Sequence, residues 1–284
     1  MNKDYIINKI EEELGNVKVA FKEVEKTYGT RHGIMITPEG ASISPTIYYD
    51  ENDDDDTIVR FVLHAYEEQA KVQLDFDTKS LAKDLTDWNW AKERIIPRIY
   101  NKERCAIKDL VTFDIAGDIA AMFSVVISLD GTGMSSTRVT RELAKNWNVT
   151  DEEILEAAKQ NLNNQLVIRD MNDIIMEMMT GEGAPTERSI NRDSEFAVAS
   201  NIGKCNGAGA LLLFKDLIEN GELEDRDYYI LPSSIHEVIF LKRYDEGFKS
   251  MVKEVNETTV SAEDFLSDNV FKYNHETKEI EVAA

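Results

Sequence analysis

The stretch Tyr228–Leu241, YYILPSSIHEVIFL, decides the fold of the carboxyl-terminal half of the chain. Its two ends, YYIL and VIFL, consist of the aromatic and aliphatic side chains that strands favour. The segment between them opens with a proline and carries short polar side chains, which is typical of a turn. The sequence therefore predicts a β-hairpin, and we expect Ile230, Val238 and Phe240 to be buried inside a sheet.

Helix and strand periodicities both occur outside this hairpin. Val17–Val24 alternates apolar with charged residues, which predicts a half-buried strand, and Asp4–Leu14 has the apolar spacing of an amphipathic helix. Thr150, followed three residues later by Glu153, forms a capping box that begins another helix. The apolar residues of Leu85–Tyr100 favour a further helix. We therefore predict an α+β protein in which mixed or antiparallel sheets are flanked by helices.

The length of the chain suits one large domain or two ordinary ones, because 42% of its 284 residues are hydrophobic. We expect two packed lobes. The N-terminal α+β lobe covers residues 1–100, and the C-terminal α+β lobe covers residues 101–284 and carries the hairpin 228–241. Gly181–Asp193 is polar and has three breakers among its first five residues, so it is the best candidate for a flexible connection.

Acidic side chains outnumber basic ones, with 54 Asp and Glu against 32 Lys and Arg and a formal net charge of −22. Such a surface repels the phosphates of nucleic acids and anionic membranes. We therefore expect neither direct nucleic-acid binding nor membrane binding. A basic protein surface is the partner that this charge favours.

The two cysteines, Cys105 and Cys205, lie far apart and neither belongs to a CxxC pair, which argues against zinc and indicates a reducing compartment. The run Asp50–Asp56 lacks the glycine and glutamate positions of a calcium loop. The first residues lack the apolar core of a signal peptide, and no apolar run reaches the ~18 residues of a membrane helix. We expect a cytoplasmic protein with no metal site and no cofactor.

The turn of the hairpin brings Ser234, His236 and Glu237 together, and these residue types can support a hydrolase. The serines lack the flanking glycines of a nucleophile elbow. The HExxH zinc motif fails because Phe240 stands where the second histidine is required. A small-molecule hydrolase that uses His236 and Ser234 remains one hypothesis, and a purely structural turn is the other reading.

A glycine-rich turn at Gly203–Gly209 is expected between a strand and a helix, where backbone amides can bind a phosphate. Its candidate binding residues are Gly203, Lys204, Asn206 and Gly207. The turn matches neither the Walker spacing nor GxGxxG. Phosphate or nucleotide binding and an ordinary tight turn are both consistent with the residues.

Arg98 and Arg138 are further candidate binding residues because each lies in apolar surroundings. A guanidinium in such a place usually needs a carboxylate partner. Arg98 follows Pro97, and Arg138 follows the turn that begins at Asp130.

Several segments resemble an uncharacterised bacterial family, domain of unknown function 5688, whose genes often lie beside mobile elements. The resemblance rests on Phe196–Leu217, Tyr228–Leu241, Ser261–Tyr273, Ile43–Tyr49 and Trp147–Ala158. It spans most of the chain, and a more distant likeness links the chain to the YtpQ-like family. The resemblance implies an intracellular α+β protein of bacteria and assigns no catalytic residue.

Three functional hypotheses follow from these patterns. The leading one is a non-catalytic protein-binding module with a strongly acidic surface, related to mobile elements or to an anti-defence role. The alternatives are the hydrolase at the hairpin turn and the phosphate or nucleotide binder at the glycine-rich turn.

Overall fold

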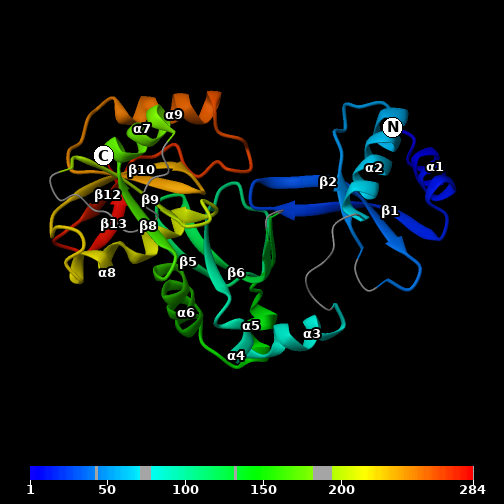
Figure 1. The fold of residues 1–284 in the computed structure, drawn as a ribbon, viewed down its shortest axis with the longest axis horizontal. Coiled ribbons are helices and arrows are strands. Elements are labelled where there is room, and N and C mark those ends of the chain that lie inside the picture. Colours follow the sequence, from blue (N-terminus) through cyan, green and yellow to red (C-terminus); the bar gives the residue numbers. More distant parts are fainter. Residues whose placement is uncertain (42–43, 71–77, 131–132, 182–193, 284) are drawn as a thin grey trace.

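The computed structural model of the chain describes residues 1–41, 44–70, 78–130, 133–181 and 194–283. The strands of the described residues form three antiparallel sheets, and helices pack beside each of them (Figure 1). This architecture confirms the predicted α+β class. Figure 1 shows the N-terminal sheet at one end of the molecule, a six-stranded sheet at the other, and a four-stranded sheet between them.

The N-terminal sheet has a hydrophobic core of its own, formed with two helices. Its strands pair in the order β1-β2-β3, and the buried isoleucines Ile6, Ile34 and Ile58 belong to one cluster. The alternating residues of β1 form the strand that the sequence predicted. The elements are α1 (Lys3–Leu14), β1 (Val17–Lys26), β2 (Gly29–Pro38), β3 (Thr46–Tyr48) and α2 (Asp55–Ala70).

The four-stranded sheet is organised around one long strand, β6, which pairs with β4 on one side and with β5 and β7 on the other. The helix α6 begins at the predicted capping box of Thr150 and Glu153, so this sequence signal is confirmed. The strands are β4 (Ile95–Asn101), β5 (Thr112–Ala116), β6 (Ile119–Asp130) and β7 (Gly133–Arg138). The helices are α3 (Thr78–Thr86), α4 (Trp88–Ala91), α5 (Arg141–Trp147) and α6 (Asp151–Asn163).

The helical prediction for Leu85–Tyr100 is wrong over its second half, which forms β4. Ile95, Ile96 and Ile99 are β-branched and favour a strand. Pro97, which marked a helix end in the sequence, is tolerated because β4 is an edge strand and needs no N–H bond on its open side. Strand β4 pairs with β6, which lies after residue 100, where the boundary between the two lobes was expected. The division of the chain into those two lobes stays a prediction.

The six-stranded sheet contains the predicted hairpin at its centre, in the strand order β13-β12-β10-β11-β9-β8. Ile230 faces Phe240 across the hairpin, and both side chains are buried together with Val238, as expected. The strands are β8 (Leu166–Asp170), β9 (Phe196–Asn201), β10 (Tyr228–Ser234), β11 (Glu237–Leu241), β12 (Phe271–Asn274) and β13 (Glu279–Val282). Its helices are α7 (Met171–Thr180), the 3-10 helix η1 (Gly207–Leu213), α8 (Phe214–Glu219) and α9 (Phe248–Thr258).

One hydrophobic core joins the four-stranded and six-stranded sheets. Ile99 of β4 and Ile119 of β6 belong to the same buried cluster as Phe214 and Phe240. The Phe214 ring lies with its centroid 4.6 Å from that of Phe240, in an edge-to-face arrangement that aromatic pairs favour. These two sheets therefore share one hydrophobic core. The expected connection at Gly181–Asp193 lies almost wholly outside the described residues.

The N-terminal sheet touches the rest of the molecule through the tip of its β1–β2 hairpin. The Tyr28 hydroxyl donates to Glu263 Oε1 at 2.7 Å, and Arg31 Nη1 lies 3.1 Å from the same oxygen. Burial and the hydrogen bond to Glu263 raise the pKa of Tyr28 to about 12. Among the residues that the structure describes, no helix is both long and apolar enough to cross a membrane.

Candidate functional site

The two candidate sites from the sequence lie against each other. The backbone N–H of Asn206, in the glycine-rich turn, donates to Nδ1 of His236, in the hairpin turn, at 3.2 Å. The other ring nitrogen of His236, Nε2, lies 2.9 Å from Asp264 Oδ1. Because Nδ1 accepts a hydrogen bond, Nε2 carries the proton and donates a hydrogen bond to the carboxylate. The imidazole thus joins three segments that are distant in the sequence.

The serine and glutamate of the hairpin turn make local contacts. Ser234 Oγ accepts from the backbone N–H of His236 at 3.0 Å, and Ser233 Oγ donates to Glu237 Oε1 at 3.3 Å. A general base needs a ring nitrogen within reach of the hydroxyl that it deprotonates. Both nitrogens of His236 already have partners, and in the described part of the chain no hydrogen bond links the ring to Ser234. This geometry supports a structural turn better than a serine hydrolase.

Close backbone approach requires glycine at position 207. A Cβ added to Gly207 would lie 2.6 Å from Cα of Ser200, and closer still to the carbonyl oxygen of His236. Ser200 Oγ also donates to that carbonyl at 2.8 Å. The start of η1 is therefore pressed directly against the hairpin turn.

Most of the backbone amides in the glycine-rich turn are used within the protein. The N–H of Lys204 donates to the carbonyl of Asn201, and the N–H of Cys205 donates to the Asn201 side chain at 3.1 Å. The N–H of Ala208 donates to the carbonyl of Ile235. Gly203 lines a neighbouring cleft. Few donors are thus left to surround a phosphate, as a phosphate-binding loop must.

Arg98 and Arg138 are brought near each other from opposite sides of β6. Arg98 lies on β4 and its Nη2 donates to Ser136 Oγ at 2.9 Å, while Arg138 is the last residue of β7. Burial lowers the pKa of the Arg98 guanidinium, and the positive charge of Arg138 lowers it further. Within the described residues neither arginine forms the ion pair with a carboxylate that the sequence led us to expect.

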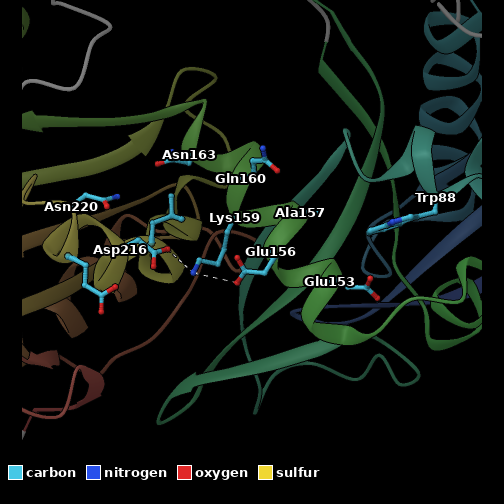
Figure 2. Close-up of a pocket in the computed structure, with 11 residues that line it drawn as sticks. Trp88, Glu153, Glu156, Ala157, Lys159, Gln160, Asn163, Asp216 and Asn220 are labelled. Atoms are coloured by element: carbon cyan, nitrogen blue, oxygen red, sulfur yellow. Dashed lines mark ion pairs between the residues drawn. The ribbon is translucent and has the colours of Figure 1, made fainter.

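A groove that the sequence did not predict lies between α6 and the η1–α8 segment, with a volume of about 680 Å³ (Figure 2). Figure 2 shows Trp88 and Glu153 at one end of the groove and Asp216 with Asn220 at the other. Carboxylates line most of its length. These are Glu153, Glu156, Asp216 and Glu219.

One lysine lies among these carboxylates. Lys159 Nζ is 2.7 Å from Asp216 Oδ2 and 3.8 Å from Glu156 Oε1, as the dashed lines in Figure 2 mark. The Lys159 side chain is 19% exposed, whereas the Glu156 side chain is 71% exposed. Four carboxylates against one ammonium leave the groove with a formal charge of −3. It can therefore bind positive charge from outside the molecule.

Residues 2–275 match the model of a family of unknown function, DUF5688. The chain belongs to this family. No curated protein and no solved structure matches this DUF5688 chain. The more distant likeness to the YtpQ-like family stays a prediction.

Sequence reasoning identified both turns in the DUF5688 chain but missed what joins them. Asp264 had no motif around it, since its role depends on a contact with His236 across 28 residues of sequence. The acidic groove had a partial signal, because Glu153, Glu156 and Gln160 of α6 are exposed and lie away from its buried stripe. In the described residues no group of three or more His, Cys, Asp or Glu side chains could hold a metal ion.

Proposed function

We propose that this DUF5688 chain is a non-catalytic protein-binding module that takes a lysine- or arginine-rich segment of a partner protein into the groove between α6 and α8. The single observation that carries the proposal is the row of carboxylates along the groove, with Trp88 at one end. An indole ring attracts a lysine or arginine cation, and carboxylates pair with it.

Lys159 illustrates the chemistry that such a partner would use. Its ammonium is held between Glu156 and Asp216 by contacts that a lysine from another chain could also make. Glu156 and Glu219 are exposed, so a partner can reach them from solvent. The formal charge of −22 adds long-range attraction, which raises the rate of encounter more than the final affinity.

The proposal includes a cytoplasmic location and a basic partner such as a nucleic-acid-binding enzyme of the host or of a mobile element. An anti-defence role is one version of it. Direct contact with nucleic acid is not part of the proposal, because phosphates would meet an acidic surface.

The experiment measures binding of a lysine-rich helical peptide, with a glutamate-rich counterpart as the negative probe. Glu156→Lys with Glu219→Lys should weaken lysine-peptide binding at least about tenfold, since each removed pair contributes about 0.5–1 kcal/mol and is replaced by repulsion. Binding should also weaken between about 50 mM and about 300 mM salt, where the Debye length falls below about 8 Å.

The matched control carries the same change of net charge on a distant face. Glu13→Lys with Glu25→Lys alters two exposed carboxylates of the N-terminal sheet and its helix. It should leave binding within about twofold of the wild type. Equal weakening by both pairs of substitutions would mean that only total charge matters, and the groove proposal would then be wrong.

A further inference from the structure

Arg98 and Arg138 project from the same face of the four-stranded sheet. Arg98 lies opposite Met122 of β6, and Arg138 lies opposite Ser124 of the same strand. Residues opposite each other in a sheet share a face, as do residues two apart in one strand. The two guanidiniums therefore stand over neighbouring positions of β6.

Both arginines are half-buried, and among the described residues neither has the carboxylate partner that such cations normally have. Arg98 Nη2 bonds to the neutral Ser136 Oγ, and Arg98 Nε is buried without a hydrogen-bond partner among the described residues. No ion pair to Arg98 or Arg138 occurs in the described residues, although acids outnumber bases by 54 to 32 over the chain. The fully buried Ser124 Oγ, which lies opposite Arg138, has no partner either. A buried cation without compensation costs free energy, so this arrangement indicates a place for an anion.

A largely apolar cleft of about 480 Å³ opens beside the arginines, because Ser136, which accepts from Arg98, lies opposite Val126 in the cleft lining. Ile96, Val126 and Met134 line it from the face of Arg98 and Arg138, as strand alternation shows. Asn161 and Leu162 of α6 line it from the opposite side of β4. Cys205 of the glycine-rich turn and Ile202 just before it also line the cleft. The volume lies within the usual range for small-molecule sites, roughly 300–1,000 Å³.

We infer that this face binds an organic carboxylate with an apolar chain, whose carboxylate pairs with Arg98 and Arg138 and whose chain enters the cleft. Guanidinium groups bind carboxylates through paired N–H donors, so two neighbouring arginines suit one carboxylate. The apolar lining disfavours a purely polar anion, because most of the cleft would then stay unfilled. This site is independent of the acidic groove, which lies between α6 and α8.

Titration calorimetry and thermal shift with four probes test the inference: octanoate, acetate, octanol and inorganic phosphate. Octanoate should bind the wild-type protein and raise Tm, while the other three should bind at least about tenfold more weakly, since each lacks the charge or the chain. Equal binding of octanol would show that the arginines are not used. Equal binding of phosphate or acetate would show that the cleft is not used. No octanoate binding would overturn the inference outright.

Substitutions separate binding from folding. Arg138→Gln should weaken octanoate binding about tenfold or more, and Arg60→Gln, on the exposed surface of α2, should leave it unchanged. Arg98→Met keeps an unbranched apolar stem and removes a largely buried charge, so Tm without ligand should stay the same or rise while octanoate binding is lost. An Arg98→Met protein that binds octanoate as the wild type does would refute the site even if Tm changed.

Discussion

Gly207→Ala is the substitution that most sharply tests the contact between η1 and the hairpin turn. The added Cβ would lie 2.6 Å from Cα of Ser200 and would also meet the carbonyl oxygen of His236, so backbone must move to admit it. Overpacking of this kind costs about 1–3 kcal/mol, and backbone neighbours place it in the upper part of that range. The same movement would disturb the bond from Asn206 N–H to the His236 ring.

Gly203→Ala is the matched control in the same turn. Its added Cβ would meet only Asn201 Oδ1, at an ordinary 3.6 Å, so its stability should stay within about 0.5 kcal/mol of the wild type. Each kcal/mol moves Tm by about 2 °C or a little more in a domain of this size, so Gly207→Ala should lower Tm by roughly 4–8 °C. Thermal denaturation followed by circular dichroism measures both. Equal Tm values for the two variants would refute the close approach of η1 to the hairpin.

Three further predictions concern other parts of the fold. Hydrogen bonds from the Lys272 ammonium and, second, from His275 lower the pKa of Asp227 in the folded protein. The contribution of Asp227 to the free energy of unfolding is therefore complete above about pH 4, the pKa of an unfolded aspartate, and is lost as the pH falls through the lower pKa of the folded state. Asp227→Asn should therefore lower the free energy of unfolding by about 0.5–1 kcal/mol at pH 7, a figure that allows for solvent screening. Urea denaturation should show this loss shrinking below pH 4. A loss that stays the same at all pH values would contradict the role given to Asp227. Thr150→Ala removes the cap of α6 and should cost about 0.5–2 kcal/mol in urea denaturation, whereas Thr150→Ser should cost little; equal losses would exclude the cap as the cause. Tyr28→Phe removes the hydroxyl bonded to Glu263, so absorbance titration should lose the phenol that ionises near pH 12; an unchanged titration curve would place that phenol elsewhere.

The sequence predicted those features of the fold that depend on neighbours along the chain. The hairpin at 228–241 was recognisable because both strands and their turn lie within one short segment. The start of α6 was recognisable because Thr150 and Glu153 form a complete signal by themselves. Strand β4 was misread because Pro97 and the aromatic residues before it also suit a helix end. Its pairing with β6, about twenty residues away, overrides that local preference.

The candidate sites were harder to predict because their geometry comes from distant segments. His236 and Asn206 were each chosen from the sequence, but the bond between them and the role of Asp264 depend on the sheet order. Arg98 and Arg138 were chosen for their apolar surroundings, and the absence of carboxylate partners among the described residues emerged only from the structure. The acidic groove needed α6 and α8 side by side, which no local pattern encodes.

Hydrogen exchange of the complex with the lysine-rich peptide tests the proposed function most directly. Exchange should slow in α6 and α8 and stay unchanged in the N-terminal sheet, and the protein that carries both Glu156→Lys and Glu219→Lys should lose this protection. Protection confined to other elements, or binding that leaves α6 and α8 exchanging as in the free protein, would contradict it.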